Sequence, residues 1–113
     1  MSPTTVVPGH VWFVDFDPVR GREQGKDRPA LVVSSDFHLA VTHRQLVTVL
    51  PLTTVKRGHW VHRVAIESGG GWVITEQIRT VSASRFRRPA SHIVVTEAEL
   101  DDVRYALKKM LMW

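Results

Sequence analysis

The chain contains no cysteine, and this absence excludes several kinds of chemistry. Disulfide bonds, a thiolate nucleophile and cysteine-ligated zinc or iron–sulfur clusters all require that residue. The chain also lacks an apolar run of about 18 residues that would span a membrane. Its first residues carry neither the basic region nor the apolar run of a signal peptide. We therefore expect a protein of the reducing cytoplasm that makes no membrane contact.

What the sequence does contain is an excess of basic residues. Its 113 residues suffice for one domain with one core, and its 43% hydrophobic and 23% charged residues are typical of a globular protein. The net charge of +4 and the pI of about 10.1 favour polyanions such as nucleic acid. The basic residues form two groups, which are Arg20, Arg22, Lys26 and Arg28, and then Arg79, Arg85, Arg87 and Arg88.

Short runs of β-branched and aromatic residues predict a mainly β protein. We expect residues 1–8 to be a disordered lead-in to a single domain over 9–113. The segment 72–81 alternates imperfectly because Glu76 shares the parity of Ile74, which we interpret as a bulge. The expected strands are Val11–Asp17, Leu31–Val33, Gln45–Leu50 closed by Pro51, Trp60–Glu67, Trp72–Val81 and Ser91–Val95, with helical turns at Phe37–Val41, capped by Ser35, and at Ala83–Arg88.

The clearest pattern predicts a helix over 97–111. Thr96 and Glu99 form a capping box, in which each side chain accepts a hydrogen bond from an otherwise unpaired backbone N–H. Apolar residues then recur at helical spacing on one face, namely Leu100, Val103, Leu107, Met110 and Leu111. Several short strands followed by one helix predict a small, twisted barrel or a curled sheet.

The stretch from Asp17 to Ser35 begins as a polar loop with glycines and ends in an apolar strand. Pro29 disfavours the α region for Arg28, so the loop should deliver Arg28 at the mouth of that strand. A fixed guanidinium beside mobile polar groups suits a phosphate site. The alternative is a solvated surface loop.

Histidine and glycine motifs indicate little chemistry. His59 and His62 are three residues apart in a predicted strand, so their rings should point to opposite faces, and we expect no metal site and no cofactor. Ser68 and the three glycines after it lack the phosphate-loop pattern and predict a turn. More promising are the polar residues at strand ends, which would converge on one groove if the strands curl together and would otherwise face solvent. They are Glu23, Gln24, Arg28, Thr53, Thr54, Glu76, Gln77 and Arg79.

Four blocks of the sequence together resemble the MazF/PemK family of toxin endoribonucleases. The blocks GHVWFVDFDP, GREQGKDRPALVVS, PLTT and EQIRTVS occur in family order, and with the helix after Glu97 they cover the chain after Pro8. The resemblance implies a curled SH3-like barrel with a C-terminal helix, the MazF/CcdB-like toxin fold. It also implies a homodimer that cleaves single-stranded RNA without a metal and is inhibited by a cognate antitoxin. DNA contact would come only indirectly, through the toxin–antitoxin complex.

The resemblance also assigns roles to residues. Arg28 matches the catalytic arginine and Thr53 the catalytic threonine of the family. Arg28 suits stabilisation of charge on the phosphate, but it is a poor base because a guanidinium keeps its proton at neutral pH. Thr53 suits orientation of the phosphate, and Glu23 and Glu76 are candidates for the general base or for RNA contact. The remaining candidates for RNA contact are Arg22, Gln24, Thr54, Lys56, Gln77 and Arg79.

Two positions depart from one branch of the family. The Kid-like branch has a catalytic arginine where this chain has Ile74, and a histidine where this chain has Arg22. The acid–base assignments of that branch therefore do not transfer. Trp60, Trp72 and Phe37 are expected to pack in the core, with base stacking as the alternative. Two rival functions remain, namely a toxin of the same fold that poisons a topoisomerase through its C-terminal helix, and a non-catalytic RNA-binding barrel.

Overall fold

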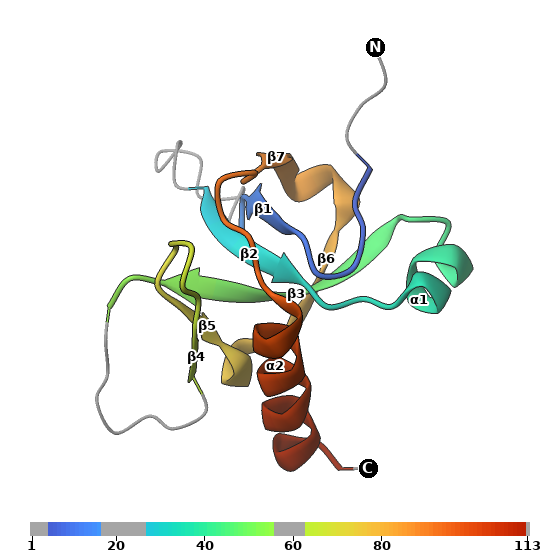
Figure 1. Ribbon diagram of the computed structural model, residues 1–113. Coiled ribbons are helices and arrows are strands. Elements are labelled where there is room, and N and C mark those ends of the chain that lie inside the picture. Colours follow the sequence, from blue (N-terminus) through green and yellow to red (C-terminus); the bar gives the residue numbers. More distant parts are fainter. Residues whose placement is uncertain (1–4, 17–26, 56–62, 113) are drawn as a thin grey trace.

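The computed structural model describes residues 5–16, 27–55 and 63–112, which form a mainly antiparallel β structure with one long C-terminal helix (Figure 1). The fold class predicted from the sequence is thereby confirmed. In chain order the elements are β1 (Val11–Val14), β2 (Arg28–Val32), α1 (Asp36–Val41), β3 (Leu46–Thr53), β4 (Arg63–Ala65), β5 (Trp72–Ile74), η2 (Thr75–Gln77), β6 (Arg79–Ser82), η3 (Ala83–Arg85), β7 (Phe86–Pro89) and α2 (Glu97–Met110).

The long strand β3 connects the two parts of the sheet. Neighbouring strands follow the order β4-β5-β3-β2-β1-β7, and every pairing is antiparallel. On the edge of β3 away from β2, Leu46–Val49 pair with β6, whereas Leu52 and Thr53 pair with β5. The chain then passes from β6 through η3 to β7, which pairs with β1 and curls the sheet back on itself (Figure 1).

Strand alternation divides the buried side chains between two cores. Leu50 and Leu52 on β3 belong to the first core, with Leu31 of β2 and Val103 of α2. The other face of the same strands supplies the second core, which lies inside the curl and includes Val49. Its members are Trp12, Val14, Ala30, Val32, Leu39, Val47, Val49 and Val81. Because successive side chains of a strand point to opposite faces, β3 contributes to both cores.

The C-terminal helix begins as the sequence predicts. Thr96 is the N-cap, its Oγ1 accepts from the Glu99 N–H at 3.1 Å, and Glu99 Oε1 accepts from the Thr96 N–H at 2.9 Å. Glu99 Oε2 also accepts from the backbone N–H of Glu67 at 2.9 Å, which ties the helix to the turn after β4. No helix in the described part of the chain has the length and apolar character needed to cross a membrane.

The predicted single strand over 72–81 is wrong. The chain forms two strands, β5 and β6, separated by the 3-10 turn η2, and these pair with different halves of β3. The break in alternation at Glu76 therefore marks a turn rather than a bulge.

The expectation that Pro51 ends the third strand is also wrong, because β3 continues to Thr53. The backbone of Thr48 bonds on the β2 side, to Val33 and Ser34, so by alternation Pro51 faces the opposite edge. On that edge the partner of β3 changes from β6 to β5, and Pro51 lies between the two pairings. The sheet therefore loses no hydrogen bond because proline lacks an N–H.

The last predicted strand, 91–95, does not form, and the final strand is β7 instead. Ile93 is buried in the first core, but its segment runs as extended coil. The hydroxyl of Ser68 takes the place of a neighbouring strand, because it accepts from the Val94 N–H and donates to the Val94 carbonyl oxygen, both at 2.8 Å.

The two short helical turns, the end of α2 and the N-terminal segment differ in how closely they follow the sequence prediction. The turn capped by Ser35 is confirmed as α1, with Ser35 Oγ accepting from the His38 N–H. The predicted turn at 83–88 forms only over Ala83–Arg85. Met110 and Leu111 are exposed, so the apolar face of α2 ends earlier than predicted. Within the segment 1–8, for which the sequence predicts disorder, Val6 packs against the second core.

Candidate active site

Arg28 and Thr53 lie at the same end of the β2–β3 ladder. The register pairs Ala30 with Pro51, and two residues further toward this end of each strand stand Arg28 and Thr53. Strand alternation places both side chains on the face of the second core, beyond the last core residues of their strands, Ala30 and Val49. Arg28 is exposed and Thr53 is half-buried. Both residues therefore stand at the same end of the ladder, and their joint role in catalysis stays a prediction.

Thr53 is positioned by the chain that follows it, through Val55, and by the neighbouring strand β5 with Gly71 just before it. Thr53 Oγ1 accepts from the Val55 N–H at 3.1 Å, which leaves its own hydroxyl proton available to a ligand. Trp72, the cross-strand partner of Thr53, is half-buried on the same face. Gly71 sits so close that a Cβ there would lie 2.9 Å from the Cα of Thr54. Thr54 itself is exposed.

Arg63 is a residue that the sequence reasoning missed. It begins β4 as the cross-strand partner of Ile74, and its side chain is only 8% exposed. Its Nη1 donates to the backbone oxygen of Val55 at 3.1 Å, and its Nη2 lies 4.0 Å from Oε2 of Glu76. A signal was present, because position 63 follows the basic and histidine-rich stretch 56–62, but the pairing of β4 with β5 could not be read from the sequence.

The other predicted site residues have different positions. Glu76, on η2, reaches the site through Arg63, and its neighbour Gln77 is exposed. Arg79 pairs with Val49, four residues along β3 from Thr53 and thus roughly 13 Å away by strand rise. Its guanidinium lies 4.7 Å from the ring centre of Phe16. Arg22, Glu23, Gln24 and Lys56 lie outside the described residues.

The aromatic residues also differ from one another. Trp72 lies beside Thr53, where it could contact a bound nucleotide. Phe37 is 75% exposed on α1, so the prediction of core packing is wrong for this residue. It also lies far from the site, because α1 precedes the opposite end of β3 (Figure 1). Trp60 is outside the described residues, as are His59 and His62.

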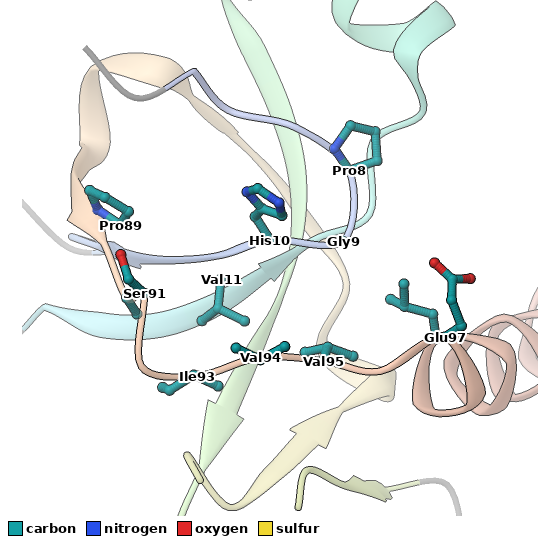
Figure 2. Close-up of a pocket in the computed structure, with 12 residues that line it drawn as sticks. Pro8, Gly9, His10, Val11, Pro89, Ser91, Ile93, Val94, Val95 and Glu97 are labelled. Carbon is teal, nitrogen blue, oxygen red and sulfur yellow. The ribbon is translucent and has the colours of Figure 1, made fainter. Parts of the chain in front are cut away.

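A cavity of about 430 Å³ lies elsewhere, between the start of β1 and the segment that leads into α2. Figure 2 shows Val94 and Val95 along one side of it, with Glu97 at the start of the helix. None of the described site residues predicted from the sequence lines this cavity. Within residues 5–16, 27–55 and 63–112, no three histidine, aspartate or glutamate side chains gather as metal ligands would.

The arrangement around Thr53 suits a phosphodiester. An exposed guanidinium, a hydroxyl with a free proton and a half-buried indole can hold a phosphate and an adjoining base. The carboxylate of Glu76 lies 4.0 Å from the guanidinium of Arg63, which in turn donates to the backbone of Val55. Together these groups can orient an anion and stabilise charge that develops on it.

Comparison with solved structures places the fold among bacterial toxins. A MazF from Deinococcus radiodurans has a TM-score of 0.73 at 28% identity, and the match covers 95% of this chain and 96% of that one. A mycobacterial endoribonuclease in complex with its cognate antitoxin has a TM-score of 0.74 at 23% identity, over 96% and 99% of the two chains.

The sequence comparisons identify the family itself. The profile of the PemK-like, MazF-like toxins of type II toxin–antitoxin systems matches residues 7–111. Endoribonuclease MazF9 of Mycobacterium tuberculosis is 34% identical over 115 residues, which covers 93% of this chain and 96% of the relative. The chain belongs to the PemK-like, MazF-like toxin family, and the resemblance seen in the four sequence blocks is confirmed.

Proposed function

We propose that this toxin is an endoribonuclease that cleaves single-stranded RNA at specific short sequences, without a metal ion, in the cytoplasm. The observation that carries the proposal is that Arg28 begins β2 and Thr53 ends β3, two residues beyond the Ala30–Pro51 pair at the same end of the ladder. Family membership and relatives named as endoribonucleases support the same activity.

The reaction uses the RNA's own 2′-hydroxyl. Its oxygen attacks the adjacent phosphorus, the bond from phosphorus to the 5′-oxygen breaks, and the products carry a 2′,3′-cyclic phosphate and a 5′-hydroxyl. A base must remove the 2′ proton, and the leaving oxygen must receive one. Arg28 can grip the two non-bridging phosphate oxygens as charge builds on them, and Thr53 can donate to one of these oxygens and maintain in-line geometry. Glu23 and Glu76 are the candidate bases.

The toxin has three expected partners, which are single-stranded RNA, a cognate antitoxin and a second copy of the chain. RNA contact extends over Arg22, Gln24, Thr54, Lys56, Gln77 and Arg79, and a cognate antitoxin inhibits the protein, as the mycobacterial complex suggests by analogy. Any DNA contact is made through the toxin–antitoxin complex. The active form is a two-fold dimer, because a small barrel offers one subunit little area for a groove that holds several nucleotides. Light scattering that gives a mass near 12.8 kDa for the fully active protein would contradict the dimer.

The test is incubation of the purified protein with a long RNA in excess EDTA. Cuts at a defined short sequence, with 5′-hydroxyl ends, are expected. Gel retardation without cuts would instead indicate a non-catalytic RNA-binding barrel. A parallel supercoiling assay addresses the topoisomerase rival, and inhibition there without RNA cleavage would overturn the proposal. Activity that is lost in EDTA and restored by a divalent ion would overturn its metal-independent form.

A further inference from the structure

The exposed arginines of β7 have no role in the reaction described so far. β7 pairs with β1 at the end of the strand order, and its side chains Arg87 and Arg88 are 39% and 62% exposed. The register of β1 against β7 shifts between Phe13 and Val14, which leaves Arg87 as an extra residue in the ladder. These arginines belong to the second basic group of the sequence, which is far along the chain from the first.

Asp27 joins the two basic groups. It directly precedes Arg28, and its carboxylate lies 3.7 Å from Arg88 Nη1 and 4.0 Å from Arg87 Nε. Asp15 accepts from Arg87 Nη2 at 2.9 Å. The two aspartate side chains are 20% and 23% exposed, less than either arginine, so the positive groups are the ones presented to solvent.

Arg88 is further ordered by an aromatic ring. Its guanidinium lies 4.3 Å from the ring centre of Phe13, its cross-strand partner. The ring of His92 stacks with Phe13 at 6.1 Å between centroids and an interplanar angle of 25°. Single-stranded nucleic acid binds such surfaces because bases stack on rings and guanidinium planes while phosphates contact the positive charge.

This surface adjoins the candidate active site. On β1, Val14 pairs with Arg28 on one side, and its neighbour Phe13 pairs with Arg88 on the other. The backbones of Arg28 and Arg88 are therefore separated by about two strand spacings, roughly 10 Å. Because Val14 and Phe13 are neighbours on β1, strand alternation directs the two guanidiniums to opposite faces of the sheet, at the end where β2 begins. An RNA strand that passes around this end of the sheet can contact both.

We propose that Arg87, Arg88, Phe13 and His92 form a binding surface for the single-stranded RNA on one side of the scissile phosphate. Here this set is called the β7 surface. The inference rests on the proposed endoribonuclease function, and it assigns to the β7 surface a contact with RNA that extends beyond the cleaved bond. Arg88 holds a base or a phosphate, and Arg87 adds attraction for the backbone.

The test measures binding separately from cleavage. Fluorescence anisotropy with a fully 2′-O-methylated RNA, which has no 2′-hydroxyl to attack, reports affinity alone at several salt concentrations. The Arg87→Ala/Arg88→Ala double variant should bind about tenfold more weakly, and its slope of log affinity against log salt should fall by about 1.4. Asp27→Asn should bind more tightly than the parent, because it removes a negative charge from the same surface.

Matched controls make the result specific. Arg104→Ala/Lys108→Ala removes two positive charges from α2, which packs on η2 and β4, and should bind like the parent. Arg88→Lys keeps the charge but not the plane, so it should retain the salt slope while losing part of the affinity. Thermal unfolding confirms that each variant is folded.

Unchanged affinity of the β7 double variant for the methylated RNA, with cleavage of ordinary RNA intact, would overturn the inference. If the same variant also loses affinity for an acidic antitoxin peptide, the β7 surface is a protein contact instead. A parent protein that cleaves no unmodified RNA would contradict the proposed function itself.

Discussion

Arg63 on β4 lies 4.0 Å from Glu76 on the turn after β5, measured from Nη2 to Oε2. The second terminal nitrogen of the same guanidinium, Nη1, donates to the backbone oxygen of Val55. Val55 in turn donates to the hydroxyl of Thr53. A nearly buried arginine thus connects a candidate base to the residue expected to orient the phosphate. We infer that Arg63 is a positioning residue for Thr53.

Replacing Arg63 should lower turnover more than RNA affinity. Arg63→Met removes the bond to Val55 and the charge beside Glu76, and we expect single-turnover cleavage to slow by about ten- to a hundredfold. Arg63→Lys keeps the charge and should recover part of the rate. Arg104→Met, at an exposed site on α2, is the control. Both Arg63 variants cleaving within about threefold of the parent would show that the bond to Val55 has no role in catalysis.

Arg28 and Thr53 should be separable from their neighbour Thr54. Arg28→Lys loses the planar fork, and Thr53→Ala loses the hydroxyl, so each should reduce single-turnover cleavage by about 10²–10³-fold. Thr53→Ser should retain much of the rate. Thr54→Ala removes a predicted RNA contact, so it should weaken RNA binding. Its single-turnover rate at saturating RNA should stay near that of the parent, because its side chain points to the other face. An equal loss of cleavage rate in Thr53→Ala and Thr54→Ala would show that the catalytic hydroxyl has been assigned to the wrong residue.

Gly71 links the turn after β4 to the candidate site. It has φ +85°, and a Cβ there would clash with the backbone oxygen of Thr53. Gly71→Ala should therefore lower both the melting temperature and the cleavage rate. Gly69→Ala is the control, since Gly69 has φ +138° but no described atom within 4 Å of an added Cβ. It should lose about 1–3 kcal/mol of stability through backbone strain, without a clash against Thr53. Equal turnover in the two folded variants would argue against coupling between Gly71 and Thr53.

Glu99 should make stability depend on pH. Partial burial tends to raise the pKa of Glu99, but bonds from the backbone of Glu67 and Thr96, and from the Thr96 side chain, lower it below its ordinary value of 4.5. Because the pKa is depressed in the folded state, the stabilisation is complete above about 4.5 and is lost as the pH falls through the folded value.

The corresponding measurement is urea unfolding of the parent and Glu99→Gln at pH values from about 3 to about 7, which cover the region where Glu99 gains its proton. The variant should be less stable at pH 7, and the difference should shrink at acid pH. Glu97→Gln removes a charge from the same helical turn and controls for the helix dipole. A stability difference for Glu99→Gln that does not change with pH would contradict the role of the carboxylate.

The sequence predicted the parts of the fold that local chemistry determines. The capping box of Thr96 and Glu99 and the cap at Ser35 formed because their bonds join residues within one turn. The single strand over 72–81 was wrong because its division depends on which half of β3 each piece meets, and that contact is distant in sequence. The strand over 91–95 failed because a side chain, Ser68, fills the place of a strand.

The candidate site, like the fold, could be predicted only where local sequence patterns determine it. Arg28 and Thr53 were predicted from family motifs, and they stand two residues beyond the Ala30–Pro51 pair at one end of the ladder. Arg63 escaped notice because its importance arises from pairing with Ile74 and from its reach to Val55, neither of which has a local pattern. The contacts of Asp27 with Arg87 and Arg88 were equally hidden, since sixty or so residues separate them along the chain.

The alternation of β3 between two cores has a consequence for errors in folding. A slip of the strand by one residue would exchange every side chain between its faces, so both cores would be mispacked at once. The same slip would present Thr54 instead of Thr53 beside Arg28. A misregistered chain would thus be unstable as well as inactive, and the register that builds the candidate site is protected by the packing of the whole molecule.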